Sequence, residues 1–272
     1  MRQNSTQAVE TEENANAMDS PLIQTSTERA VTTLTLNRPE RRNALTIELL
    51  DALCAGIAKA EADPGQRILI LRGAGPAFCS GLDLHEASAP TRFEMTATLV
   101  ARALRVLSGT RLATIARVHG AAVAGGAGLM TACDIVVAAA GAKIGYPEVR
   151  RGLVPGLVMT FLRRQVGERD AREILMLGEL FSAERARDFG LVNRVVPEAE
   201  LDAELEKVTA ALLAGGPEAI ARAKKLWAEL WPSEVDADLN RALTYHLEAR
   251  HSAEAQEGIA AFREKRPPRW AQ

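Results

Sequence analysis

Short runs of β-branched and apolar residues recur along the first two thirds of the chain, and they predict strands. The run RILILRG (67–73) is apolar without alternation, which is typical of a strand buried on both faces of a sheet. Because helical segments separate these runs, the pattern favours an α/β fold with mainly parallel strand pairing. The predicted strands are residues 29–37, 67–73, 113–120, 134–140 and 143–149.

The segments between the strands show helical spacing of apolar residues and recognisable end signals. Thr46 is suited to cap a helix that continues to about Ala62, since its hydroxyl can accept a hydrogen bond from a first-turn N–H group. Leucines and an isoleucine recur on one face of this segment, and Asp63-Pro64-Gly65 stops it. Further helices are expected at about 93–107 and 127–132.

The last third of the chain changes character and becomes mainly helical. Ser182 is expected to cap a short helix that Gly190 ends, and a brief strand follows up to Pro197. Helices are then expected at about 198–213, 217–231, 233–250 and 252–264. The chain is therefore expected to comprise a disordered polar tail (1–20), a strand-rich core (21–197) and a helical C-terminal region (198–272).

The charge balance excludes two classes of partner. The 272 residues include 33 Lys and Arg against 35 Asp and Glu, which gives a net charge of −2. A chain without a basic excess has no general attraction for nucleic acid or an anionic membrane. The longest apolar run, residues 118–140, contains Asp134 and several glycines, so a buried helix and strand are expected there instead of a membrane span.

Cysteine usage and the N-terminal composition point to a reduced, cytoplasmic protein. Cys54, Cys79 and Cys133 lie far apart in the sequence and form no CxxC pair. The N-terminal segment lacks the apolar stretch of a signal peptide and carries acidic residues that mitochondrial presequences avoid. We therefore expect a cytoplasmic location.

Two glycine-rich segments follow predicted strands and carry the candidate chemistry. RGAGPAFCSGLDLHE (72–86) contains a tight glycine turn, and VHGAAVAGGAGLMTACD (118–134) opens a helix with glycines. Backbone N–H groups left free at such turns and helix starts can together form an oxyanion hole. Each segment alone is equally typical of a structural turn, and neither has a dinucleotide-binding or Walker pattern.

Four segments in register carry a resemblance to a known family. LNRPERRNALT (36–46) precedes the two glycine-rich segments, and IGYPEVRRGLVPG (144–156) follows them. In this order they resemble the enoyl-CoA hydratase/isomerase family, the crotonase superfamily, over roughly residues 25–272. The resemblance implies a crotonase-like (ClpP/crotonase) spiral of ββα units, and C-terminal helices that assemble homotrimers or hexamers.

The resemblance also implies an acyl-CoA thioester substrate, as in fatty acid metabolism, with no metal, flavin or nicotinamide cofactor. By matching positions, the thioester oxygen lies between the backbone N–H groups of Leu82 and Gly125. The stretch from Leu82 through Asp83 and Leu84 to His85 then lines the CoA and thioester site. Arg41 and Arg42 would lie near the adenine and phosphates of the ligand.

The acid–base residues distinguish one family reaction from another. Hydratases of this family use two glutamates; the position of the first is Gly128 here, and the position of the second is Glu148. A single glutamate can shuttle a proton between C2 and C4 of the substrate, which is the Δ3,Δ2-enoyl-CoA isomerase reaction of the family. This reaction is our first expectation.

Three other functions stay open at this point. The first is hydration, with Glu86 or His85 replacing the carboxylate that is absent at Gly128. The second is another enolate reaction such as acyl-CoA decarboxylation. The third is an acyl-CoA-binding scaffold without catalysis, which the presence of Glu148 disfavours.

Overall fold

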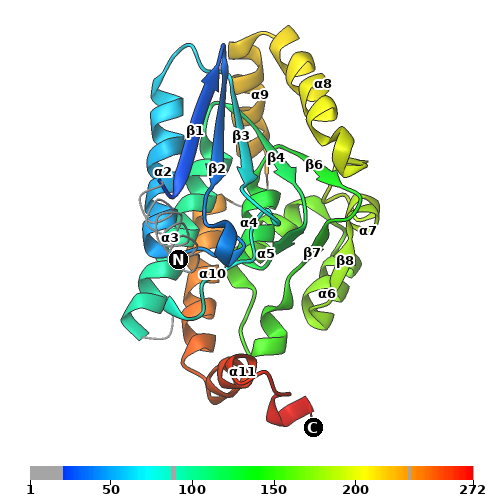
Figure 1. Ribbon diagram of the computed structural model, residues 1–272. Helices are drawn as coiled ribbons and strands as arrows, with labels where there is room; N and C mark the ends of the chain where they lie inside the picture. Colours follow the sequence, from blue (N-terminus) through cyan, green and yellow to red (C-terminus); the bar gives the residue numbers. More distant parts are fainter. Residues whose placement is uncertain (1–20, 87–89, 232–233, 272) are drawn as a thin grey trace, which may run out of the picture.

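The structure is a computed structural model that describes residues 21–86, 90–231 and 234–271; the tail predicted at 1–20 lies outside the described residues. A six-stranded sheet, in the order β1-β2-β3-β4-β6-β9, runs through the described part of the chain (Figure 1). Only β1 pairs antiparallel in this sheet, with β2. Its strands are β1 (Ile23–Glu28), β2 (Val31–Leu36), β3 (Ile68–Gly73), β4 (Ala113–Val118), β6 (Ile135–Ala139) and β9 (Arg194–Val196).

A second sheet consists of three short strands, two of which directly follow strands of the first. After β4 the chain turns through Gly120 into β5 (Ala121–Val123), and after β6 it enters β7 (Lys143–Gly145). Gly120 has a φ of +60°, and a Cβ there would lie 1.9 Å from the Pro76 carbonyl oxygen, so this turn requires glycine. β5 pairs parallel with β7, which pairs antiparallel with β8 (Leu180–Ser182). This strand–strand–helix repeat confirms the predicted ββα spiral.

Helices cover both faces of the large sheet and form the C-terminal region. The helices of the core are α2 (Ile47–Ala62), α3 (Pro90–Gly109), α4 (Gly125–Ala132), α5 (Gly156–Gln165), α6 (Glu168–Leu177) and α7 (Ala183–Asp188). The C-terminal helices are α8 (Leu201–Ala214), α9 (Pro217–Glu229), α10 (Val235–Arg250) and α11 (Ala253–Arg263). Short 3₁₀ helices are η1 (Pro39–Arg41), η3 (Pro147–Arg151), η4 (Glu198–Glu200) and η5 (Arg269–Ala271).

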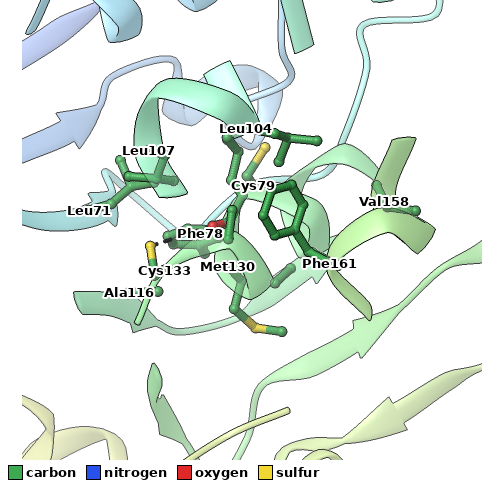
Figure 2. Close-up of a cluster of buried hydrophobic side chains, with 14 of the residues drawn as sticks. Leu71, Phe78, Cys79, Leu104, Leu107, Ala116, Met130, Cys133, Val158 and Phe161 are labelled. Carbon is green, nitrogen blue, oxygen red and sulfur yellow. Dashed lines mark hydrogen bonds between the residues drawn. The ribbon is translucent and has the colours of Figure 1, made fainter. Parts of the chain in front are cut away.

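The alternation of buried residues along β3 explains why that strand has no polar face. Leu69 and Leu71 pack into the main core beneath α2, α3 and α4. Ile68 and Ile70 pack into a second cluster on the other face of the sheet, against Leu201 and Val208 of α8. Figure 2 shows part of the main core, where Leu71, Phe78, Met130 and Phe161 come from four different segments.

Some elements of the predicted secondary structure were wrong or missing. The strand expected at 143–149 ends at Gly145 and gives way to η3, because Pro147 has no N–H group for a strand ladder and suits the first turn of a helix. The prediction lacked the helices α5 and α6 and the strands β1, β5 and β8. The apolar run at 118–140 forms β5, α4 and β6. Among the described residues, none of the helices combines the length and the apolar composition that a membrane span requires.

The C-terminal helices divide between the two ends of the molecule. α8 and α9 lie beside the upper part of the sheet in Figure 1, whereas α11 lies at the lower end. Lys224 of α9 donates to the Asp134 carboxylate at 2.7 Å and to the Leu112 carbonyl at 3.0 Å, which fastens α9 to the core. α10 packs against α3 and α5, and α11 packs against η3. This second contact brings α11 to the edge of the candidate site.

Candidate active site

A cavity of about 490 Å³ opens where the glycine-rich loops, η3 and the C-terminal helices α10 and α11 meet. The chain segments that line it are far apart in the sequence, since the spiral brings the ends of successive strands to one place. All the site residues predicted from the sequence line this one cavity: Arg41, Arg42, Leu82, Asp83, Leu84, His85, Gly125 and Glu148.

The backbone N–H groups of Leu82 and Gly125 are both free for a ligand. Leu45 pairs with Leu82 as in a parallel strand, and its bonds go to the neighbours of Leu82: Leu45 N–H to the Gly81 carbonyl at 2.8 Å, and Asp83 N–H to the Leu45 carbonyl at 3.0 Å. Within the described residues, neither the Leu82 nor the Gly125 N–H has a hydrogen-bond acceptor. A Cβ on Gly81 would lie 3.4 Å from the Gly125 nitrogen, so the two loops touch.

Ala124 holds the start of α4 in a strained conformation. Its φ of 51° and ψ of −122° are unusual for a residue with a side chain and cost on the order of 1–3 kcal/mol. Its own N–H donates to the Gly145 carbonyl at 2.9 Å, and its carbonyl accepts from the Gly128 N–H at 2.9 Å. This turn leaves Gly125 as the first helical residue with an unused N–H. The sequence carries no signal for it, because alanine is not typical of positive φ.

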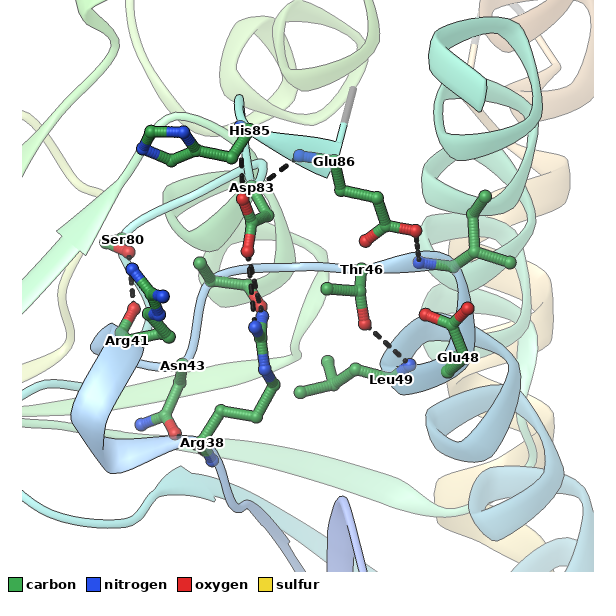
Figure 3. Close-up of polar contacts among 12 residues, drawn as sticks. Arg38, Arg41, Asn43, Thr46, Glu48, Leu49, Ser80, Asp83, His85 and Glu86 are labelled. Carbon is green, nitrogen blue, oxygen red and sulfur yellow. Dashed lines mark hydrogen bonds and ion pairs between the residues drawn. The ribbon is translucent and has the colours of Figure 1, made fainter. Parts of the chain in front are cut away.

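Asn43, which the sequence analysis missed, joins the loops behind the cavity. It is fully buried with φ of 55°, and its amide Nδ2 donates to the carbonyls of Ala77 (2.8 Å) and Ala74 (2.9 Å). Its Oδ1 accepts from the Arg38 N–H at 2.8 Å. The loop after β2 is thereby fixed to the loop after β3, and the Arg38–Asp83 ion pair joins the same two loops (Figure 3).

Asp83 lines the cavity but is engaged by its own loop. Its Oδ2 pairs with the Arg38 guanidinium at 3.2 Å, and its Oδ1 accepts from the N–H groups of His85 (3.1 Å) and Glu86 (3.3 Å). Burial raises the pKa of this carboxyl, but the bonds from Glu86, Arg38 and His85 outweigh burial and lower the pKa below its usual value. Asp83 is therefore ionised and stabilises the loop that presents Leu82.

Only one of the two residues considered as substitutes for the missing glutamate lines the cavity, and that residue is His85. The Glu86 carboxylate points towards the start of α2 (Figure 3), where it pairs with Arg92 at 2.5 Å and accepts from the Ile47 N–H at 3.4 Å. This contact caps α2 and directs the Glu86 carboxylate away from the cavity.

Glu148 is a buried carboxyl group on η3 that lines the cavity. Burial raises its pKa from 4.5 to about 7, and the positive charge of Arg151 only partly offsets this effect. Its Oε2 is buried and accepts no hydrogen bond from the described residues. A carboxyl group with a pKa near neutrality and an unused oxygen is suited to take up and release a proton.

Gly128 lies on the first turns of α4, and the space next to it is already filled. A Cβ at this position would lie 2.6 Å from Cγ1 of Val158 and 3.6 Å from Leu104. Val158, on α5, also lines the cavity. The structure therefore has a valine where a side chain from position 128 would have to enter.

The comparisons with known proteins show the family of this chain. A sequence model of the family described as Enoyl-CoA hydratase/isomerase matches residues 26–272. The chain belongs to the enoyl-CoA hydratase/isomerase family. It is 37% identical over 241 residues to a putative enoyl-CoA hydratase of Thermus thermophilus, covering 86% of this chain and 95% of the relative. It is 35% identical over 257 residues to the mevalonyl-coenzyme A hydratase SIDH of Beauveria bassiana, covering 88% of this chain and 91% of the relative.

Solved structures of the family have the same fold. A crystal structure of a putative enoyl-CoA hydratase from Mycobacterium avium paratuberculosis superposes with a TM-score of 0.86 at 33% identity, covering 92% of this chain and 100% of that one. An enoyl-CoA hydratase/isomerase from Xanthobacter autotrophicus has a TM-score of 0.82 at 33% identity, with coverage of 89% and 93%. The chain is thus a member of a family of enzymes that act on CoA thioesters, which favours catalysis over the binding-scaffold alternative.

Two further residues of this hydratase/isomerase site escaped the sequence analysis. Arg151, from η3, and His246, from α10, both line the cavity. The His246 ring stacks on Phe93 with the ring centroids 5.2 Å apart and bonds through Nδ1 to the Val154 carbonyl at 3.0 Å. Its position in the cavity wall had no sequence signal, because α10 follows Glu148 by almost ninety residues and packs there only in the folded chain.

Proposed function

We propose that this chain is a Δ3,Δ2-enoyl-CoA isomerase in which Glu148 alone moves the proton. The observation that carries this proposal is the pair formed by Glu148 and Gly128. Glu148 supplies a buried carboxyl group with a pKa of about 7. Position 128 supplies no second carboxylate, and Val158 fills the neighbouring space.

The two free N–H groups would act on the thioester oxygen. When a proton leaves C2, negative charge moves onto that oxygen, and the N–H groups of Leu82 and Gly125 stabilise it in place. One such donor typically lowers the activation barrier by about 3 kcal/mol. Both donors are fixed by backbone pairing and need no rearrangement when the charge develops.

The proton transfer then needs only one base. The Glu148 carboxylate takes a proton from C2 of a 3-enoyl-CoA, and the electrons of the broken C–H bond form a dienolate with the thioester. The protonated Glu148 returns the proton to C4, the double bond moves to C2–C3, and the carboxylate is restored. A pKa near neutrality suits both halves of this cycle.

The coenzyme A portion would leave the cavity past the loop after β2. Arg41 and Arg42 are exposed at this edge of the cavity, where their charges can meet the ligand phosphates. The segment from Leu82 to His85 forms the neighbouring wall. The described residues hold no group of three His, Cys, Asp or Glu side chains suited to a metal, and a reaction without any cofactor stays part of the proposal.

Hydration is the competing function, since the relatives named above include two hydratases. It needs a water held beside C3, which the family arranges with two carboxylates. His85 lines the cavity and is the expected replacement for one of them. An acyl-CoA decarboxylation or other enolate reaction would use the same two N–H groups, and stays the third alternative.

The test compares two wild-type rates. Isomerisation of 3-hexenoyl-CoA should be faster than hydration of crotonyl-CoA by the same preparation. Glu148→Gln, which retains the shape of the side chain without its basicity, is the control for both rates. Rapid hydration without isomerisation would contradict the proposal, and so would full isomerase activity in Glu148→Gln.

We also propose that residues 198–272 form an oligomerisation region and that the protein is a cytoplasmic homotrimer or hexamer. At the C-terminal end of α9, Leu226 and Trp227 are 53% and 70% exposed, and Leu230, the residue that follows the helix, is 72% exposed. Apolar side chains gathered on one short helix are typical of a surface that another subunit covers.

A further inference from the structure

Arg151 places a positive charge in the wall of the cavity, and the proposed isomerisation makes no use of it. The residue ends η3, one turn after Glu148, and both side chains line the same cavity. The Arg151 side chain is half-buried in this wall, and burial lowers the pKa of its guanidinium. Buried charges in proteins are usually paired, because removing an ion from water is costly.

Arg151 has no such pair in residues 21–86, 90–231 and 234–271. No carboxylate in these residues lies within the 4.0 Å limit of an ion pair with its guanidinium. Its contacts are a weak hydrogen bond from Nη1 to the Pro147 carbonyl at 3.5 Å and the ring of Phe262, 4.5 Å below the guanidinium. Its Nε is buried without an acceptor. Glu148 acts on it through space and does not bind it directly.

The guanidinium is held in place by close contact between α11 and η3. A Cβ on Gly258 of α11 would lie 2.4 Å from the Arg151 carbonyl, so only glycine allows this approach. A Cβ on Gly152 would likewise lie 2.5 Å from the Glu254 backbone. Phe262, one turn after Gly258, is thereby fixed beneath the guanidinium. A donor group fixed in this way loses little freedom when it binds a ligand.

We propose that Arg151 is a subsite for a carboxylate carried by the acyl chain, so that the preferred substrates are acyl-CoA thioesters with a second, free acid group. This inference rests on the proposed acyl-CoA function of the cavity. The guanidinium supplies the paired N–H donors that match a carboxylate. Leu153, Leu157 and Val158 supply apolar wall for the methylene groups between the carboxylate and the thioester.

Calorimetric titration of the full-length protein tests the proposal with saturated ligands that cannot react. The ligand pairs are succinyl-CoA with butyryl-CoA, glutaryl-CoA with valeryl-CoA, and adipyl-CoA with hexanoyl-CoA. In each pair only the terminal carboxylate differs. The wild type should bind the carboxylated member of at least one pair tighter by about 10-fold or more, the usual effect of a charged hydrogen-bonded pair.

Two variants assign that preference to Arg151. Arg151→Met retains the apolar stem and should bind both members of the pair alike, with the affinity for free coenzyme A unchanged. Arg151→Lys retains the charge and should retain part of the preference. The wild-type comparison needs no variant, so it holds even if a variant fails to fold.

Three results would contradict the proposal, and each has a different meaning. Equal affinity for both members of every pair in the wild type would overturn the carboxylate subsite and leave the acyl-CoA site intact. A loss of affinity for free coenzyme A in Arg151→Met would make Arg151 a phosphate ligand instead and would also overturn the subsite. If the wild type bound none of the six thioesters, the acyl-CoA function itself would fail, and the subsite with it.

Discussion

At the scale of single residues, the account depends on a carboxyl group whose environment opposes ionisation. Glu148 is 8% exposed, and burial dominates its raised pKa. The same burial that leaves it half-protonated near neutrality makes the ionised form costly to the fold. In the proposed mechanism Glu148 is therefore a compromise between stability and proton transfer, as is common for catalytic acids and bases.

The pH dependence of isomerisation should follow this pKa. Glu148 must be ionised to take the C2 proton, so kcat/KM should rise as pH increases through about 7 and level off above it. The stability effect has the opposite sign: a carboxyl group whose pKa is raised in the folded state favours folding most below its unfolded value near 4.5, and that contribution is lost as pH rises through about 7. Above this pH, Glu148→Gln should melt at a higher temperature than the wild type. A pH-independent kcat/KM would contradict the assignment.

Restoring the second glutamate should fail unless Val158 is reduced in size. Gly128→Glu alone should lower the free energy of unfolding by about 1–3 kcal/mol or more, because its Cβ would lie 2.6 Å from Val158. The double variant Gly128→Glu/Val158→Ala has space for the carboxylate and should hydrate crotonyl-CoA faster than the wild type. Val158→Ala is the matched control. A stable, hydrating Gly128→Glu single variant would show that the valine does not exclude a side chain.

The candidate residues that could be predicted lie within recognisable motifs, although Arg151 and Asn43 in the same motifs were missed, and residues contributed by distant helices could not be predicted. Leu82, Gly125 and Glu148 lie within glycine- or proline-marked segments whose spacing is informative. His246 and Phe262 reach the cavity only because α10 and α11 pack there, and nothing in their local sequence distinguishes them from ordinary helix residues. Asn43 looks like one more polar loop residue until its buried amide bonds are seen.

At the scale of elements, the helices and strands that were predicted correctly are those whose local sequence signal agrees with their burial in the fold. Thr46 caps α2 through the Leu49 N–H at 3.2 Å, and β3 is buried on both faces, as their sequences indicate. The helices α5 and α6 were missed because each has only ten residues, and no side chain accepts a capping bond at either N-terminus. Their positions are set by packing around the cavity, which a local pattern does not contain.

The start of α4 is the element on which catalysis should depend most. Gly125→Pro removes the N–H group, and proline is tolerated in the first helical position, so turnover should fall by about 100-fold or more. Gly125→Ala is the matched control: it introduces a Cβ 3.1 Å from Leu45 Cδ1 but retains the N–H. Steady-state kinetics on both variants, with circular dichroism to verify folding, separate the two effects. Equal activity of the two variants would contradict the role of this N–H.

At the scale of the whole molecule, the family resemblance correctly predicted the fold of the core. The oligomeric state stays a prediction. The core is complete within one chain, since both faces of the sheet are covered by helices of that chain. The apolar side chains at the C-terminal end of α9 are exposed, and a second subunit of the proposed trimer or hexamer would cover them.

Light scattering coupled to size-exclusion chromatography should report a trimer or hexamer at micromolar concentration. Trp227→Ser/Leu230→Ser should shift the mass towards the monomer, because both side chains are exposed at the C-terminal end of α9. The melting temperature of the variant verifies that the subunit still folds. A stable wild-type monomer at this concentration would remove the oligomerisation role of residues 198–272.

The central claim is that one buried carboxyl group carries a proton from C2 to C4, and isotope transfer in a single turnover tests it most directly. A 3-hexenoyl-CoA with deuterium at C2 is mixed with excess enzyme in ordinary water, and the product is analysed by mass spectrometry for label at C4. Because Glu148 is buried, the deuteron that it accepts should be returned partly before it exchanges with water. The account predicts deuterium at C4 of the 2-enoyl product. A product whose C4 carries only solvent hydrogen would contradict it.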